Sequence, residues 1–284
     1  MKKKRRRPIR RRKRTRRSKA DRFAAQLERG EKALVDGRPH DVIDACEAAL
    51  ATGFVRGRER ARVLALQANA LIMLNRFEEA HNALTLAIYH DPDDAYLFYN
   101  RSLTAFYIGR SAEAVLNLRR AIELEGDGRE AANFAAQMAD LQEIIEGELG
   151  IRGPAFTFEQ LLEQQSLYHK ALLLFMNEDW QGAEDGLRQV IAMSDGLAPP
   201  WGNLGLCLLI QQRYDEAEVA LKRALEIDPD YEPARSNIER LPEIRETGEL
   251  PPLTISSSSR NVAIKTDIKF EGYSGGLYGN ADSR

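Results

Sequence analysis

The chain has 284 residues, of which 43% are hydrophobic, and this is enough apolar material for one or two domains with a real core. Its formal net charge is -2, from 41 Lys and Arg against 43 Asp and Glu. Two cysteines, Cys46 and Cys207, exclude a disulfide scaffold and are typical of a reducing, cytoplasmic compartment. No apolar run approaches the roughly 18 residues of a membrane helix, so we expect no membrane insertion.

The first segment in chain order, residues 1–19, carries a large share of the positive charge. It holds 14 Lys and Arg and no acid, which leaves 27 bases against 43 acids in the rest of the chain. A block of like charge repels itself and buries nothing, so we expect a disordered arm that contacts an anionic partner. Its cations are Lys2, Lys3, Lys4, Arg5, Arg6, Arg7, Arg10, Arg11, Arg12, Lys13, Arg14, Arg16, Arg17 and Lys19.

Three uses of this arm are open. Arg side chains grip phosphate oxygens in pairs, and we favour nonspecific binding to nucleic acid, because no aromatic residue is interleaved to read bases. The arm could instead lie on the acidic remainder of the chain. Its two basic clusters, 2–7 and 10–17, would also fit a nuclear-import signal if the source were eukaryotic.

A pattern of 34 residues recurs after the arm. The stretches RFEEAHNALTLAIYHDPD (76–93) and RYDEAEVALKRALEIDPD (213–230) share an aromatic residue, two acids, Ala and Leu at helical spacing, and a closing Asp-Pro-Asp. Aligned on these two, five copies cover the residues 23–56, 61–94, 95–128, 164–197 and 198–231. We number the positions within each copy from 1 to 34.

These copies resemble the tetratricopeptide repeat family, whose members stack antiparallel helix pairs. The loosest copy, 23–56, has Val42 and Cys46 where the family has Ala and a large residue. The clearest copy, 198–231, matches with Trp201, Leu204, Gly205, Leu208, Ala217, Leu221, Ala224 and Pro229. The resemblance implies an all-α solenoid that binds a protein or peptide.

The residue pattern supports this fold independently of the family name. Positions 4, 7, 8 and 11 fall on one face of a first helix, and positions 20, 24 and 27 on one face of a second. Small residues such as Gly205 and Ala217 stand where the two helices must approach closely. One pair cannot bury both its faces, so the copies must stack on one another.

The repeats divide into two modules. Module 1 covers residues 20–147 and ends in a closing helix at 129–147; module 2 covers 158–241 and ends in a closing helix at 232–241. Residues 148–157, with Gly and Pro, are a linker, and the two modules either stack rigidly or pivot there. Four small residues of the first closing helix keep the first-helix pattern: Ala132, Ala135, Ala136 and Ala139.

The last segment, residues 242–284, is polar and rich in Pro and Ser, and we expect it to be flexible. Within it, residues 261–271 alternate apolar and polar side chains, which predicts a short strand. Its apolar members are Val262, Ile264, Ile268 and Phe270. Two interpretations are open: chance alternation in a disordered tail, or a strand that docks on a partner or back on the repeats.

The sequence offers little chemistry. The four histidines, at 40, 81, 90 and 169, are too far apart to suggest a metal site, and no C-x-x-C motif is present. The stretch GYSGG (272–276) has the letters of a nucleophile elbow, but no histidine follows Ser274. We therefore predict neither catalysis nor a cofactor.

The family's geometry turns positions 2, 5, 6, 9, 12 and 13 toward a concave groove. The candidate partner-binding residues at such positions are Asn69, Tyr96, Tyr99, Asn100, Tyr107, Phe134, Tyr168, Leu172, Phe175, Met176, Asn203, Leu206, Ile210 and Asn237. In peptide-binding members an Asn at position 6 hydrogen-bonds the ligand backbone. The alternative is that the closing helices or the C-terminal tail cover these residues.

Some members clamp the C-terminal carboxylate of a chaperone with Lys and Arg. The corresponding positions here hold Glu130 and Phe134, or Pro233 and Asn237, so we expect no such clamp. The sequence therefore favours a non-enzymatic adaptor with a protein or peptide in its groove. The alternatives are a nucleic-acid- or ribosome-associated factor in which the arm dominates, and an accessory subunit of a catalytic complex.

Overall fold

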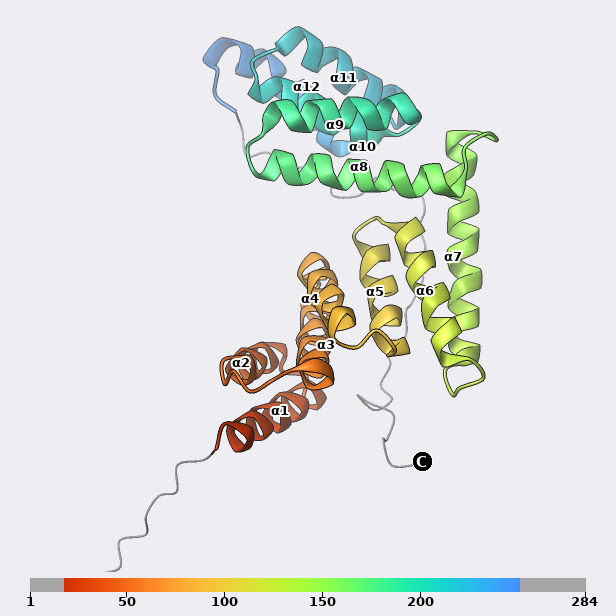
Figure 1. Cartoon of the computed structure of the whole chain (residues 1–284). Coiled ribbons are helices and arrows are strands. Elements are labelled where there is room, and N and C mark those ends of the chain that lie inside the picture. Colours follow the sequence, from red (N-terminus) through yellow and green to blue (C-terminus); the bar gives the residue numbers. More distant parts are fainter. Residues whose placement is uncertain (1–17, 251–284) are drawn as a thin grey trace, which may run out of the picture.

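The computed structural model describes residues 18–250, and within this range the chain is entirely helical, with twelve α-helices and no strand (Figure 1). The helices are α1 (Lys19–Val35), α2 (Pro39–Leu50), α3 (Gly57–Met73), α4 (Phe77–His90), α5 (Ala95–Tyr107), α6 (Ser111–Glu125), α7 (Ala131–Arg152), α8 (Phe158–Met176), α9 (Trp180–Met193), α10 (Ala198–Ile210), α11 (Tyr214–Ile227) and α12 (Glu232–Thr247). The predicted all-α solenoid is confirmed. Nearly all of the basic arm and the predicted strand at 261–271 lie outside the described residues.

The five predicted repeats are the five helix pairs α1–α2, α3–α4, α5–α6, α8–α9 and α10–α11. The small residues stand where two helices meet. A Cβ on Gly205 would lie 2.6 Å from Cγ of Leu221 on α11, so only glycine fits there. Ala68 of α3 and Ala80 of α4 are both fully buried. Close approach of the backbones is therefore what these positions require.

The turn inside each pair shows that the repeat register holds from the first copy to the last. In every pair the residue at position 15 has a positive φ, which reverses the chain between the helices. These residues are Gly37 (68°), Asn75 (56°), Gly109 (81°), Glu178 (62°) and Gln212 (60°). Only two of them are glycine, so the stacked helices impose this backbone conformation on side chains that rarely adopt it.

Helix α7 departs from the predicted closing helix and linker. It continues to Arg152, five residues beyond the expected end, and stops at Gly153, whose φ of 103° breaks the helix. The chain bends over the next few residues, and Thr157 and Gln160 cap the start of α8 with reciprocal hydrogen bonds. The linker is therefore shorter than predicted.

One side of α7 packs against α6 through Phe134, Leu141 and Ile144, all buried. The four alanines that keep the first-helix pattern are exposed, because no second helix follows α7 in the chain. Figure 1 shows α7 at the edge of module 1, with α8 crossing it at a steep angle. Whether the small residues of a first-helix pattern are buried thus depends on whether a second helix follows in the chain and packs against them.

We expect the same substitution to cost very different amounts of stability at two alanines that share position 8, Ala68 on α3 and Ala136 on α7. Ala136→Gln on α7 should change the free energy of unfolding by less than about 0.5 kcal/mol, because the side chain meets solvent. Ala68→Gln should cost about 3 kcal/mol, because it forces extra volume and an unpaired amide into a full core. Urea unfolding of the two variants measures this difference, and equal losses would show that α7 is packed on both sides.

Helix α12 also runs past its predicted end, through Pro242 to Thr247. Leu241 and Ile244 are buried on either side of the exposed proline. In the last turn Arg245 pairs with Asp215 at 2.8 Å and Glu218 at 2.9 Å, both on α11. Burial of Leu241 and Ile244 in the core, with a smaller contribution from these pairs, stabilises the helix beyond a proline that donates no backbone hydrogen bond.

Candidate protein-interaction surface

The candidate partner-binding residues lie on the first helices α3, α5, α7, α8 and α10 and on α12. On α10, Gly205 faces Leu221 of α11. Successive residues of an α-helix are rotated by about 100°, so the side chains of Asn203, Leu206 and Ile210 point roughly 100–160° away from the direction of α11. The same rule turns Leu172 and Met176 of α8 away from α9, which Ala171 contacts at Gly186. We call this side of the first helices, turned away from the second helices, the inner face.

Aromatic rings of α5 and α7 form a cluster on the inner face of module 1. The rings of Tyr99 and Phe134 are stacked with centroids 4.8 Å apart, and Tyr96 meets Phe134 edge-on at 6.2 Å. Gln137 of α7 donates a hydrogen bond to the Tyr99 hydroxyl at 2.7 Å. Burial raises the pKa of Tyr99, so the phenol stays neutral. Tyr99 and Phe134 are buried, and Tyr96 is half-buried.

Side-chain amides link neighbouring first helices. Asn100 of α5 donates a hydrogen bond to Asn69 of α3 at 3.3 Å, and both side chains are half-buried. In module 2, Asn203 of α10 donates to the Tyr168 hydroxyl of α8 at 2.8 Å, and both are buried. Asn237 of α12 is half-buried. Three of these amides are therefore engaged within the protein itself.

The remaining candidates differ in exposure. Leu172, Phe175 and Leu206 are buried, and Phe175 packs edge-on against Trp180 at 5.0 Å. Ile210 is half-buried. At the same repeat position, 13, Tyr107 is 43% exposed and Met176 is 72% exposed. The inner face thus combines buried and exposed candidates, and their role in partner binding stays a prediction.

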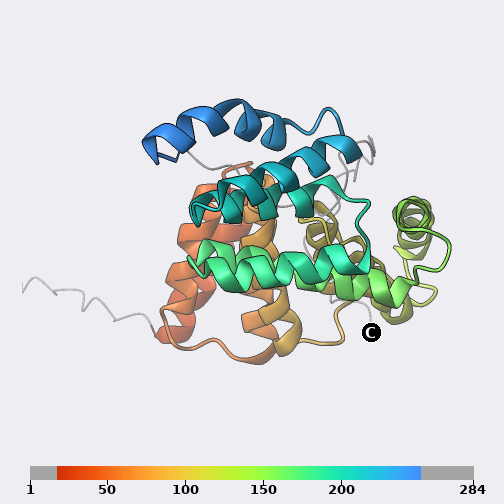
Figure 2. The same cartoon turned by 90° about the horizontal axis from the view of Figure 1, so that it is seen from above.

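A buried polar network joins module 2 to module 1. Gln165 of α8 accepts a hydrogen bond from the backbone N–H of Ala112 at 3.1 Å, and donates to Ser111 at 2.7 Å and to Glu148 of α7 at 2.8 Å. Ser111 in turn donates to Glu148 at 2.8 Å. Figures 1 and 2 show α8–α12 lying over one end of module 1. The modules therefore meet through buried contacts as well as through the linker.

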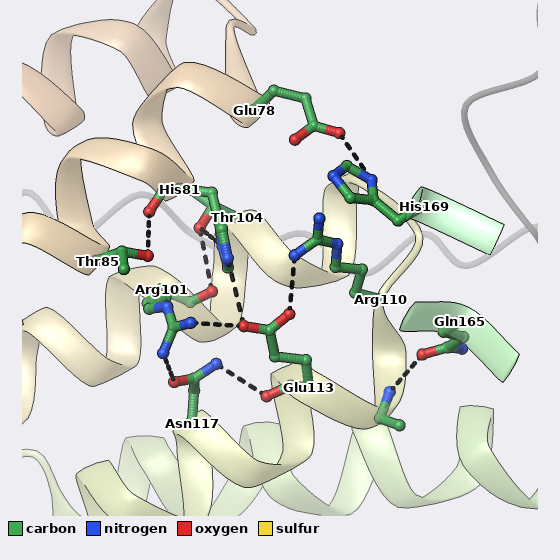
Figure 3. Close-up of polar contacts among 11 residues, drawn as sticks. Glu78, His81, Thr85, Arg101, Thr104, Arg110, Glu113, Asn117, Gln165 and His169 are labelled. Atoms are coloured by element: carbon green, nitrogen blue, oxygen red, sulfur yellow. Dashed lines mark hydrogen bonds and ion pairs between the residues drawn. The ribbon is translucent and has the colours of Figure 1, made fainter. Parts of the chain in front are cut away.

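A charged cluster lies next to this junction, beneath α8 (Figure 3). The carboxylate of Glu113 accepts hydrogen bonds from Arg101 at 2.7 Å and Arg110 at 3.1 Å, and it lies 3.3 Å from Nε2 of His81. Burial alone would raise the pKa of Glu113, but the hydrogen bond from His81 and the charges of His81 and the two arginines outweigh it and lower the pKa to about 2. Glu113 is therefore ionised at any pH near neutrality.

His169 of α8 reaches into the same cluster (Figure 3). Its Nδ1 lies 3.7 Å from the carboxylate of Glu78 on α4. Burial, followed by the nearby charges of Arg110 and His81, lowers the pKa of His169 to about 4, so the imidazole is neutral at pH 7. The contact between the modules at this point is thus between a carboxylate and a neutral ring.

A recurring pair of residues in the sequence points to this cluster. Arg at position 16 and an acid at position 19 recur in four of the five repeats: Arg38–Asp41, Arg76–Glu79, Arg110–Glu113 and Arg213–Glu216. In three of the repeats at least one partner of the pair is more than half exposed, but Arg110 and Glu113 are only 20% and 21% exposed. His81 of α4 and Arg101 of α5 also contact Glu113, and α8 lies next to this pair, so tertiary contacts distinguish it from the exposed pairs.

The part of the chain that the structure describes holds neither a candidate metal site nor a candidate membrane span. Between residues 18 and 250, no group of three or more His, Cys, Asp or Glu side chains is placed to hold a metal ion. No helix in that range is both long and apolar enough to cross a membrane. Both cysteines are buried thiols, and burial raises the pKa of each to about 12.

Comparison with known proteins finds repeats of one kind. Residues 198–231 match the family model described as tetratricopeptide repeat. No curated protein matches the chain. Among solved structures, the first TPR of Spaghetti (RPAP3) bound to an HSP90 peptide is 19% identical with a TM-score of 0.39, covering 44% of this chain and 94% of that chain.

Two further solved structures match longer stretches. The MamA protein is 16% identical with a TM-score of 0.35, covering 83% of this chain and 100% of that chain. The TPR2AB domain of yeast Sti1 in complex with HSP90 is 14% identical with a TM-score of 0.39, covering 79% and 85%. Likeness at this level says nothing about what this chain binds.

Proposed function

We propose that this chain, whose residues 198–231 match the tetratricopeptide repeat family, is a repeat protein of that kind and works as a non-catalytic adaptor. The inner face of the repeats binds a segment of another protein. The basic arm, residues 1–19, contacts a second, anionic partner. The two activities belong to different parts of the chain, so each can be removed without the other.

The exposure of Tyr107 and Met176 is the observation that supports protein binding. Both are large side chains at position 13 of their repeats, and they stay 43% and 72% exposed on the inner face. Tyr and Met are enriched at protein interfaces relative to the rest of the surface. The half-buried amides of Asn69 and Asn100 lie on the same face, so hydrogen-bonding groups accompany the apolar ones.

We expect Met176→Glu and Tyr107→Glu each to weaken partner binding by about 30-fold or more, because truncating or charging a central apolar contact costs about 2 kcal/mol or more. Their melting temperatures should stay close to the wild-type value, since both side chains are exposed. Proteins that co-purify with the full chain would be identified, and the dissociation constant of the purified partner measured by titration.

Two substitutions on the second helices serve as matched controls for this experiment. Val219→Glu on α11 matches Met176→Glu, with 67% exposure, and Leu116→Glu on α6 matches Tyr107→Glu, with 39%. Both should bind the partner like the wild type. If all four variants weaken binding equally, the inner face is not the binding surface. If none does, the repeats do not bind the partner in this way.

A second candidate function is that of a nucleic-acid- or ribosome-associated factor, in which the arm is the main binding element and the repeats dock a complex. The segregation of charge in the sequence favours it, because the arm holds 14 of the 41 bases and none of the acids. A cationic segment of this density binds phosphate backbones by releasing their counterions. If the chain binds a protein partner but no nucleic acid, only the first candidate function, the adaptor, remains.

A further inference from the structure

At repeat position 9, the inner face of module 2 is more deeply buried than that of module 1. At position 9, Leu206 of α10 is 1% exposed and Leu172 of α8 is 7% exposed, whereas Asn69 of α3 is only half-buried. On α10 the same side also buries Pro199 and Asn203. The α10 side chains turn away from α11, and Leu172 of α8 turns away from α9, so none of them points at the second helix of its own pair.

We propose that residues 251–284 of this same chain bind the inner face of module 2 in cis, as an internal ligand. This proposal rests on the proposed function, because it places the segment on the surface that a protein partner would use. A partner must then displace the segment before it can bind. The internal ligand would reduce the affinity for every partner that uses α8 and α10.

The end of the described chain lies within reach of this face. Helix α12 starts beside α10, where Tyr231 contacts Gly202, and its last turn is paired with Asp215 in the first turn of α11, which follows the end of α10. Residues 251–260 can span about 33 Å, more than the roughly 20 Å length of α10. Residues 261–271 can span about 36 Å as a strand, enough to cross both α8 and α10.

The chemistry of the segment fits the surface. Val262, Ile264, Ile268 and Phe270 alternate with polar residues, so one side of an extended chain is apolar. Leu172, Leu206 and Ile210 offer an apolar surface to that side. Burial of aliphatic side chains on both partners supplies the driving force.

The basic arm is the other segment outside the described residues, and it fits less well. Apart from Met1, its only large apolar residue is Ile9, among 14 cations. Burying those cations against leucine side chains would cost more than the contact returns. The arm also leaves the structure next to α1, at the end of the array far from α8 and α10 (Figure 1).

The test uses the full-length protein and a full-length variant that carries Ile264→Asp and Ile268→Asp. A fluorescein-labelled synthetic peptide with the sequence of residues 258–273 is titrated with each protein and followed by anisotropy. The variant should bind the peptide, because its own segment no longer competes. The wild type should bind about 100-fold more weakly, because a tethered segment competes at an effective concentration on the order of 1 mM.

Matched controls locate the contact. Lys265→Ser with Asp267→Ser changes the polar side of the same strand, and this protein should behave like the wild type. Adding Ile210→Glu to the variant with aspartates at 264 and 268 should abolish peptide binding, because it places a charge on the inner face. If that protein unfolds, Met176→Glu replaces it, since Met176 is 72% exposed.

Three results would overturn the proposal. The peptide could bind neither protein, or bind both with the same affinity. Alternatively, sedimentation could show a wild-type dimer that the aspartates dissociate, which would assign the segment to a second copy of the chain. No external partner takes part in this experiment, so a negative result would not contradict the adaptor proposal. Conversely, failure to find an external partner would not contradict binding of residues 251–284 to the inner face.

Discussion

Affinity for generic RNA or duplex DNA should fall by about 10³–10⁵ between 50 and 200 mM salt in the intact protein. This estimate assumes that the arm engages roughly six to ten phosphates, each of which releases a counterion when it is neutralised. Of the arm's 14 cations nine are Arg, which binds phosphate oxygens in pairs. Binding should be independent of base sequence, because no aromatic side chain in the arm is available to stack on bases.

Deletion of residues 1–17 is the appropriate variant for this measurement. It keeps Ser18 and Lys19, where α1 begins, and Ser18 and Asp21 cap that helix with reciprocal hydrogen bonds. The deleted protein should lose nucleic-acid binding and keep its melting temperature. A protein whose arm is replaced by a Gly/Ser segment of equal length controls for the length of the chain. Two results would contradict nucleic-acid binding by the arm: nucleic-acid binding by the protein that lacks residues 1–17, or no nucleic-acid binding by the intact protein at 50 mM salt. The arm would then contact the acidic repeats or an import receptor.

Replacement of Glu113 by Gln should lower the free energy of unfolding at pH 7 by about 3 kcal/mol, as the linkage between pKa and stability predicts for this carboxylate. Its pKa is lowered from 4.5 to about 2 in the folded protein, where it pairs with Arg101 and Arg110. The variant also leaves the two guanidinium groups without their shared counterion. Urea unfolding of the wild type and the variant measures the difference.

The repeat offers a matched control at the same position. Glu79→Gln removes the same position-19 carboxylate from the same kind of pair with the Arg at position 16, but there the two side chains are 56% and 45% exposed. Exposed pairs contribute little, so the loss should stay within about 0.5 kcal/mol. Equal losses in the two variants would show that the burial of Glu113 beneath α8 has no energetic effect.

The pH dependence of the Glu113 effect has a definite sign. Because the folded pKa is depressed, the stabilisation is fully present above the unfolded pKa of about 4.5 and is lost as the pH falls toward 2. The difference between wild type and Glu113→Gln should therefore be constant from pH 7 to about 5 and shrink below that. A difference that grows on acidification would contradict the assignment.

The candidate surface could be predicted only in part. The repeat register placed every candidate residue except Asn237, which lies on α12, on a first helix, because helical spacing decides which residues share a face. It could not tell Leu206, which is 1% exposed, from Met176, which is 72% exposed, although both belong to inward-facing positions. Exposure depends on what lies over each helix, and that is a property of the assembled chain.

The sequence by itself determined the helix pairs and their register, because these depend on local spacing. The 34-residue period fixes which side chains face one another within a pair, and position 15 reverses the chain in all five repeats, even where Glu178 or Gln212 stands there. Small residues such as Gly205 could be recognised because a close approach of two helices admits no others.

Only the tertiary structure decided how the pairs end and where the modules meet. The alanines of α7 have the pattern of a buried face yet are exposed, because no second helix covers them. Helix α12 passes Pro242 because Leu241 and Ile244 on either side of it are buried in the core, and Arg245 also pairs with α11. Arg110 and Glu113 repeat a pair found in three other repeats, but here they are only 20% and 21% exposed, next to His81, Arg101 and α8. These outcomes depend on contacts between residues far apart in the chain, which local periodicity does not encode.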